Sequence, residues 1–255
     1  MDCVITAGGL PEPDDPLYAY TQGKTKALLD MGGRTMLERV VDALQAAKNV
    51  DDIVVAGLGS DLGMTFQRPV FHVPDQGSLI GNVLGGIRFL KERQPDLGMI
   101  ILSSSDIPSI TADIVDQYVA ACAPFDKAIY YNFVDEPTME ARFPGSNRTF
   151  VKLKGVNVAG GDLLLAHSDL AESHIDLWTA LTEGRKHAWK LARLVGITFL
   201  LKFLFRQVSL TDIEEKVLQT IGRPVQAVLS PFAELAMDAD KPHQVDLLKR
   251  EFEGT

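Results

Sequence analysis

The sequence predicts an α/β fold with three layers, α/β/α, around a mostly parallel central sheet. Two observations carry the prediction. Apolar β-branched runs alternate with helical periodicity over the first 130 residues, and the continuous apolar run at 98–102 is typical of a central strand covered on both faces. Parallel strands are joined by right-handed crossovers, so the intervening helices cover the sheet. The 255 residues suffice to bury about three-quarters of the unfolded surface.

The elements of the first half follow from local patterns. A helix is expected after Thr35, because Thr35 and Glu38 have the spacing of a capping box before an apolar-periodic run. A second helix is expected at 79–90. Short strands are expected at 4–7, 52–56, 70–73 and 98–102.

The second half is less regular, and we expect it to remain part of one domain, 1–255. A capping box at Thr211 and Glu214 indicates a helix inside a mostly helical stretch, 163–221, which would form an insertion or lid. The other expected elements are a loop at 138–147, strands at 149–153 and 224–229, and a helix at 242–252.

Composition limits the partners. The net charge of −9 opposes general binding to nucleic acid, and no window reaches the roughly 20 apolar residues of a membrane span. We expect a buried helix at 199–205, the most apolar stretch, with a membrane-surface helix as the alternative. The amino terminus lacks the pattern of a secretory signal, and Cys3 and Cys122 form no disulfide framework, so we expect a cytoplasmic protein without a membrane partner.

The stretch from Val4 to Leu37 is predicted to be a phosphate cradle. An apolar strand ends in Ala7-Gly8-Gly9, and glycines let backbone N–H groups approach an anion. Lys24 and Lys26 then add positive charge. The spacing excludes a Walker A loop and a dinucleotide fingerprint. A solvated loop without a ligand is the other interpretation.

This opening resembles the nucleotidyltransferases with a molybdenum-cofactor guanylyltransferase-like (MobA-like) domain, relatives of the sugar-phosphate nucleotidyltransferases. Ala7-Gly8-Gly9, then Lys26 with an apolar pair, then Gly32-Gly33 match their signature. The resemblance implies the Rossmann-like architecture of nucleotide-diphospho-sugar transferases, glycines around a triphosphate and a lysine on phosphate. The loop between Gly9 and Lys26 is longer than usual and acidic, and it lacks an arginine that many members carry.

Acidic residues beyond strands suggest a metal site. Asp106 follows the central strand, where ligands of open α/β sheets bind, and it is followed by Pro108 as in the family's Asp-x-Pro segment. The resemblance makes Asp106 a Mg²⁺ ligand. Aligned on Pro242, Asp240 matches a second ligand and Asp238 a supporting residue. Helix capping is the alternative interpretation of both segments.

Two further segments resemble parts of the family that face the substrates. The segment containing Gln76, Gly77 and Ser78 would lie against the nucleobase and ribose, or would simply be a turn with Ser78 as a helix cap. The segments expected to face the acceptor contain Arg148, Thr149, Gly161 and Asp162.

Asp162 occupies a position where asparagine is commoner in the family, which changes an amide into an anion that only accepts hydrogen bonds. The basic residues at 185–193 form either a solvated face or an acceptor-phosphate site.

The resemblance implies a Mg²⁺-dependent nucleotidyltransferase that transfers NMP from an NTP to a small phosphorylated or hydroxylated acceptor and releases pyrophosphate. Lys26, Asp106 and Asp240 would be the catalytic residues, with Ala7, Gly8, Gly9 and Lys24 in the nucleotide site. The alternatives are a nucleotide-sugar-dependent glycosyltransferase and a catalytically impaired nucleotide sensor. Base, acceptor and oligomeric state stay open.

Overall fold

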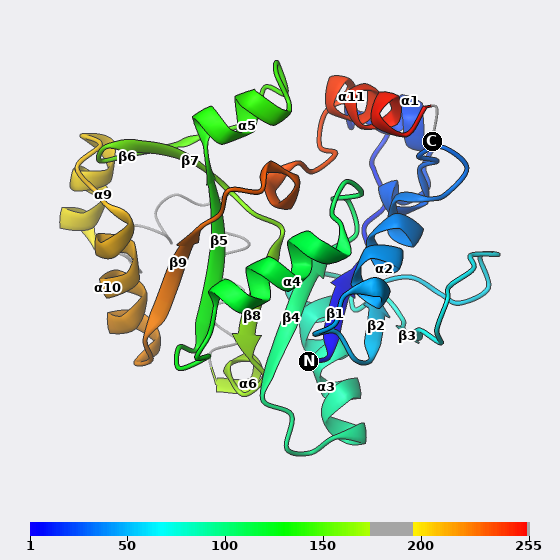
Figure 1. The fold of residues 1–255 in the computed structure, drawn as a ribbon, viewed down its shortest axis with the longest axis horizontal. Coiled ribbons are helices and arrows are strands. Elements are labelled where there is room, and N and C mark those ends of the chain that lie inside the picture. Colours follow the sequence, from blue (N-terminus) through cyan, green and yellow to red (C-terminus); the bar gives the residue numbers. More distant parts are fainter. Residues whose placement is uncertain (174–195, 254–255) are drawn as a thin grey trace.

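Figure 1 shows the computed structural model, which describes residues 1–173 and 196–253. The strands are β1 (Cys3–Thr6), β2 (Ile53–Ala56), β3 (Phe71–Val73), β4 (Met99–Ser104), β5 (Ile129–Asp135), β6 (Val151–Leu153), β7 (Val156–Gly160), β8 (Leu163–His167) and β9 (Val225–Leu229). The α-helices are α1 (Tyr18–Thr21), α2 (Met36–Ala46), α3 (Leu79–Arg93), α4 (Ala112–Ala121), α5 (Glu136–Arg142), α6 (Leu170–Ser173), α9 (Ile197–Leu204), α10 (Leu210–Ile221) and α11 (Pro242–Phe252). Two 3₁₀ turns are η1 (Lys26–Leu28) and η2 (Ala233–Ala236).

The described strands form one mixed, mostly parallel sheet of nine strands in the order β3-β2-β1-β4-β8-β5-β7-β6, with β9 beside β5. The first four are mutually parallel. β8 is antiparallel to both β4 and β5, so β5 returns to the direction of β4. Within the described residues only β7 and β8 run against the other strands. The predicted α/β fold is confirmed.

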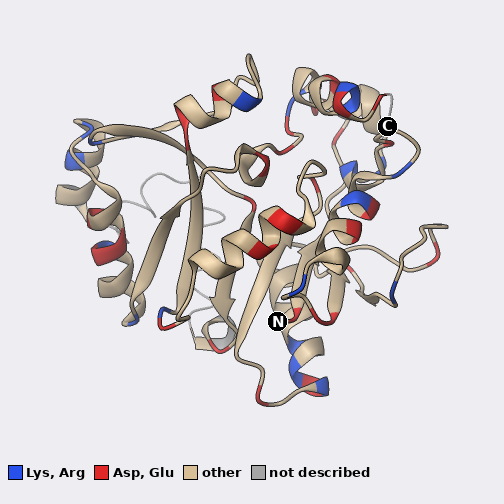
Figure 2. Ribbon diagram, viewed as in Figure 1, with Lys and Arg blue, Asp and Glu red and all other residues tan. Residues whose placement is uncertain are grey.

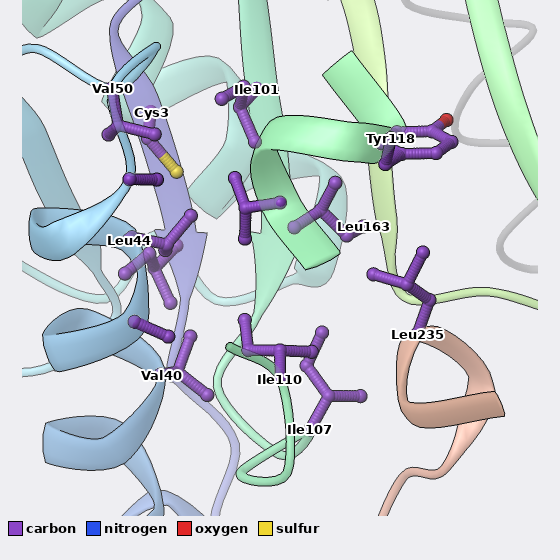
Figure 3. Close-up of a cluster of buried hydrophobic side chains, with 14 of the residues drawn as sticks. Cys3, Val40, Leu44, Val50, Ile101, Ile107, Ile110, Tyr118, Leu163 and Leu235 are labelled. Carbon is purple, nitrogen blue, oxygen red and sulfur yellow. The ribbon is translucent and has the colours of Figure 1, made fainter. Parts of the chain in front are cut away.

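β1 is buried on both faces because alternate side chains enter different cores. Cys3 and Ile5 join the cluster with α2 and α4 in Figure 3, where Val50 lies beside Cys3, and Leu44 and Val40 of α2 follow further along β1. Val4 faces α3 on the other side of the sheet. A Cβ on Gly86 of α3 would lie 2.5 Å from Val4 Cγ1, so the glycine permits this close helix–sheet contact.

Local signals placed two helices of the first half, α2 and α3, correctly, whereas α1 and α4 were not predicted. Thr35 accepts from Glu38 N, and the Glu38 carboxylate accepts from Thr35 N, which confirms the capping box that opens α2. The strands expected at 4–7, 52–56, 70–73 and 98–102 correspond to β1 to β4. The predicted helix at 79–90 is α3, and the one at 242–252 is α11.

Three predictions in the second half were wrong in part, although α6, α9 and α10 do lie in the stretch predicted to be mostly helical. The stretch 163–221 begins with strand β8 rather than a helix, because Leu163–His167 completes the sheet between β4 and β5. The loop predicted at 138–147 overlaps helix α5, capped by Asp135. The capping box of α10 uses Ser209 and Asp212, two residues earlier than predicted. The middle of the predicted insertion, 174–195, lies outside the described residues.

The apolar stretch at 199–205 is helical, as α9, but it is not buried as predicted. Phe199 packs against a buried cluster, whereas several large side chains further along α9 are exposed. No helix among the described residues has the length and apolar content needed to cross a bilayer.

Candidate functional site

Three segments meet at one end of the strands in the middle of the sheet, where β1 and β4 end and β8 begins. β1 and β4 are parallel neighbours whose last paired residues are Thr6 and Ser104, and Ser105 N donates to Thr6 O at 3.1 Å. β8 runs the opposite way, so it begins where β4 ends, and Ser104 N donates to Asp162 O at 2.8 Å. The glycine loop after β1, Asp106 after β4 and Asp162 before β8 therefore converge at this end of the strands.

The C-terminal segment brings two more carboxylates to the same place. Ala239 N donates to Asp106 O at 3.2 Å, which holds the segment between η2 and α11 against the end of β4. Asp106, Asp238 and Asp240 each offer a carboxylate oxygen, and these oxygens lie within 4.8 Å of one another. The structure thus brings Asp106 and Asp240 together although 134 positions separate them in the sequence (240 minus 106).

Lys26 lies between these two carboxylates. Its Nζ contacts Asp106 Oδ2 and is 2.6 Å from Asp240 Oδ1. Burial lowers the pKa of Lys26, but the charges of Asp106 and Asp240 raise it more, so the net pKa shift is upward and the side chain stays a cation. Thr25 donates to Ala7 O at 3.0 Å and thereby fixes η1 beside the glycine loop.

A second cation, Arg148, is partly buried against the acidic cluster. The Arg148 guanidinium contacts Asp238 and lies 3.9 Å from Asp162 Oδ2. Burial, followed by the charge of Asp106, raises the pKa of Asp162 to about 7, although Arg148 opposes the shift. Arg148 was expected to face the acceptor, but its charge is already engaged by these two carboxylates.

The net charge and the ligand atoms of this site suit a divalent cation. Four carboxylates against two cations leave a charge of −2 when every group is ionised. The donors are oxygen atoms alone, which suits a hard cation such as Mg²⁺ or Mn²⁺ better than a softer metal. Among residues 1–173 and 196–253, Asp106, Asp238 and Asp240 therefore form a group that can hold a metal.

The glycine loop packs closely against the start of α3. A Cβ on Gly8 would lie 2.5 Å from Asn82 Nδ2 and 3.2 Å from Gly57 Cα, so no larger residue fits without movement. Gly9 has φ of +96°, a backbone conformation that favours glycine. Asn82 joins the loops further, because it donates to Asp75 Oδ1 at 2.9 Å and accepts from Gln76 N at 2.7 Å.

The segment expected at the nucleobase therefore does lie beside the glycine loop. Gln76 Nε2 donates to Pro74 O at 2.8 Å, so this amide N–H is engaged within its own loop. Gly77 has φ of +77°. Ser78 caps α3 by accepting from Gly81 N at 3.0 Å, which is the turn-and-cap interpretation of this residue.

The remaining predicted site residues are placed less centrally. Lys24, two positions before Lys26, is exposed. Thr149, which follows Arg148 in the sequence, is exposed as well. Gly161 lies directly over Asn132, because a Cβ there would be 2.3 Å from Asn132 Nδ2. The basic residues at 185–193 lie outside the described part of the chain.

Asn82 and Asn132 were missed by sequence reasoning. Asn82 ends the segment expected at the nucleobase but was given no role there, and Asn132 belongs to no recognised motif. Each packs against a glycine distant in the sequence. The pairing of Arg148 with Asp238 was also missed, because it joins two segments that only the finished sheet brings together.

The raised pKa of Asp162 predicts a pH-dependent stability in metal-free protein. The folded state binds a proton that the unfolded state has released, so this group's contribution to the free energy of unfolding falls as pH rises from about 4 to 7. We expect the melting temperature of Asp162→Asn to exceed that of wild type by about 2–4 °C at pH 8 and by little near pH 4, as measured by thermal unfolding in EDTA.

Asp169→Asn provides the matched control. Burial raises the pKa of Asp169, but its hydrogen bond with Arg223 leads the effects that lower it, and the net shift is downward. That linkage acts only below about pH 4, so between pH 4 and 8 the difference in melting temperature between Asp169→Asn and wild type should stay constant. A difference between Asp162→Asn and wild type that does not change with pH would contradict the assignment.

A glycine loop after the first strand, with carboxylates at the ends of parallel strands, is the arrangement of α/β proteins that bind ligands beyond the carboxyl ends of their strands. The family model described as "MobA-like NTP transferase domain" matches residues 3–194. The chain belongs to this MobA-like NTP transferase family and is a nucleotidyltransferase. Asp238 and Asp240 lie beyond the matched range.

Solved structures agree with this fold. A hypothetical transferase from Thermus thermophilus is 30% identical, with a TM-score of 0.80 over 96% of this chain and 98% of that chain. The 4-diphosphocytidyl-2C-methyl-D-erythritol synthase from Anaerococcus prevotii is 11% identical, with a TM-score of 0.58 over 99% and 97%. CMP:2-keto-3-deoxy-manno-octonic acid synthetase complexed with CTP is 11% identical, with a TM-score of 0.56 over 99% and 97%. The last two, at this low identity, support the fold alone.

Proposed function

We propose that the protein transfers NMP from an NTP to a small acceptor carrying a phosphate or a hydroxyl group, with Mg²⁺, and releases pyrophosphate. The observation that carries this proposal is the convergence of Asp106, Asp240 and Lys26 beside the glycine loop. Nucleotidyl transfer depends on positioning and on stabilising charge, and these groups supply both.

The nucleotide side of the site is formed by the glycine loop, η1 and the start of α3. The backbone of Ala7, Gly8 and Gly9 would hold the phosphates, and the predicted base segment lies against it through Asn82. Asp106 and Asp240, supported by Asp238, would hold Mg²⁺. When bound, the metal would neutralise negative charge on the reacting phosphate.

Lys26 has a different position before and after nucleotide binding in this proposal. In the structure its Nζ is held by two carboxylates. A triphosphate in the glycine loop offers it a competing set of anionic oxygens nearby. Lys26 would then move onto the phosphates, with the exposed Lys24 as a second cation, and leave Asp106 and Asp240 available to the metal.

The acceptor would approach from β7 and β8, where Gly161 and Asp162 follow one another. Asp162 can accept a hydrogen bond from an acceptor hydroxyl. An acceptor phosphate would have to draw Arg148 away from Asp238 or use the neighbouring backbone and Thr149. Both acceptor classes therefore belong in the test.

The experiment measures pyrophosphate release from each of the common NTPs with Mg²⁺ and three acceptor sources: sugar phosphates, free sugars and polyols, and the small-molecule fraction of a cell extract. We expect release that needs one NTP, an acceptor and the metal, and that EDTA abolishes. Nucleotide binding without release from any source would favour a sensor. Turnover of nucleotide sugars in place of NTPs would favour a glycosyltransferase.

A further inference from the structure

The first turn of α11 contains a buried amide that joins two segments of the candidate site. Gln244 is 1% exposed. Its Oε1 accepts from Asp240 N at 3.1 Å, and its Nε2 donates to Ser146 O at 3.2 Å. Both ends of the amide are therefore engaged, one by the segment that carries Asp240 and the other by the loop that follows α5.

Asp240 is less enclosed than the other carboxylate that Lys26 contacts. The Asp240 side chain is 54% exposed, whereas that of Asp106 is 5% exposed, so packing constrains Asp106 more than Asp240. In the structure Lys26 also holds the Asp240 carboxylate. Under the proposed function Lys26 moves onto the phosphates, and the hydrogen bond from Asp240 N to Gln244 stays.

The way α11 begins explains what the glutamine does. Figure 2 shows acidic and then basic positions on the chain that leads into α11. The N-cap residue, Lys241, makes no cap hydrogen bond with its side chain, and its Nζ donates to Asn147 O at 2.6 Å instead. A glutamine at the third helical position commonly accepts from the N–H of the N-cap residue. Gln244 occupies that position but reaches one residue further back, to Asp240.

The loop at the other end of the amide is fixed to the same C-terminal segment. Ser146 is 0% exposed, so its carbonyl is a firmly placed partner for Gln244. Two residues further on, the Arg148 guanidinium contacts Asp238. Contacts therefore join the loop and the C-terminal segment on both sides of Asp240 in the sequence.

We propose that Gln244 is a positioning residue for Asp240. The proposal rests on the proposed function, in which Asp240 and Asp106 hold Mg²⁺. Gln244 acts through the backbone of Asp240, which its two hydrogen bonds hold in place against the Ser146 loop. Without them the half-exposed Asp240 carboxylate moves relative to the buried Asp106, and the two ligands no longer meet at one ion.

The test is Gln244→Met, which keeps the length of the side chain and removes both hydrogen bonds. Ser146 O still has His243 Nε2 at 2.8 Å, so the variant should fold. Titration of the nucleotide-free full chain with Mn²⁺, followed by electron paramagnetic resonance of the free ion, measures the affinity. We expect the dissociation constant to rise about tenfold, the size of effect common for residues that orient metal ligands. The same change in Lys26→Met protein, where no ammonium lies between the carboxylates, should have at least the same effect.

Gln45→Met is the matched control. Gln45 is also a buried glutamine on a helix, and its amide also joins backbone groups, because it donates to Arg68 O at 2.8 Å and accepts from Arg68 N at 3.0 Å. It lies near the end of α2, where the chain turns toward the start of β2 and away from the site. Gln45→Met should lose stability to a similar degree in thermal unfolding and bind Mn²⁺ like wild type.

Turnover gives a second measurement. Excess metal overcomes a displaced ligand, whereas it does not repair a damaged fold. The Mg²⁺ concentration for half-maximal pyrophosphate release should rise about tenfold in Gln244→Met, and the rate at saturating Mg²⁺ should stay within about threefold of wild type.

Unchanged Mn²⁺ affinity in Gln244→Met, or an equal loss of affinity in Gln45→Met, would overturn the positioning role. A failure of both wild type and Lys26→Met to bind Mn²⁺ would overturn it as well. The proposed function fails separately, by the absence of pyrophosphate release from wild type, and the Mn²⁺ titration still decides the role of Gln244 in that case.

Discussion

Asp106→Ala is expected to release pyrophosphate at least about a hundredfold more slowly than wild type and to remain folded. Asp106 is the buried carboxylate at the end of β4, and it supplies both an oxygen for the metal and a partner for Lys26. In the variant Lys26 keeps Asp240, so no unpaired buried cation is left to unfold the site. Steady-state turnover and thermal unfolding of the same preparations measure the two effects.

Asp169→Ala is the control for this loss. Asp169 also follows a strand of the sheet and pairs with a cation, Arg223 at 2.6 Å, but it lies past the end of β8 that is remote from Asp162. Its removal should leave turnover within about twofold of wild type. If Asp106→Ala turned over as fast as Asp169→Ala, the proposed mechanism would be discarded.

Lys26→Met is expected to change metal binding and catalysis in opposite directions. In nucleotide-free protein the Lys26 ammonium occupies the space between Asp106 and Asp240 and repels a cation that approaches them. A unit charge at about 4 Å contributes several kcal/mol at a protein surface, so its removal should tighten Mn²⁺ binding at least about tenfold. Turnover should fall about a hundredfold, because the phosphates lose their cation.

Titration of nucleotide-free protein with Mn²⁺, followed by electron paramagnetic resonance of the free ion, measures the affinity. Lys24→Met is the matched variant for this titration, since Lys24 is an exposed lysine two positions away. It should bind Mn²⁺ as wild type does. Equal or weaker binding by Lys26→Met would show that Lys26 and the metal do not compete.

The first half of the fold was predictable from sequence because its signals are local. Paired glycines end β1, a capping box opens α2, and an apolar run marks β4. Asp106 could be selected because a carboxylate after a buried parallel strand lies where such sheets bind ligands. The resemblance to a family supplied Asp240, which no local pattern distinguishes from a helix cap.

The second half was harder because its elements depend on distant partners. Leu163-Leu164-Leu165-Ala166 is a short apolar run, and periodicity alone does not separate a buried strand from a buried helix. The neighbours β4 and β5 decide for a strand. The prediction that α9 is buried was wrong because an apolar sequence does not by itself show that other parts of the chain cover it.

The electrostatics of the site were the least predictable feature. Arg148 was expected to face an acceptor, and in the structure it is engaged by Asp238 and Asp162. The raised pKa of Asp162 follows from burial and from the other carboxylates gathered by the fold. Neither effect can be inferred from spacing, because each arises where segments remote in sequence meet.

The location of a bound metal tests the central claim most directly. Crystals grown with Mn²⁺ and a non-hydrolysable analogue of the NTP that binds best would give the ion's position from anomalous scattering. The account predicts a peak about 2.2 Å from carboxylate oxygens of both Asp106 and Asp240, with Lys26 Nζ withdrawn onto the phosphates. A peak bonded to neither aspartate, or a nucleotide bound away from Gly8 and Gly9, would contradict it.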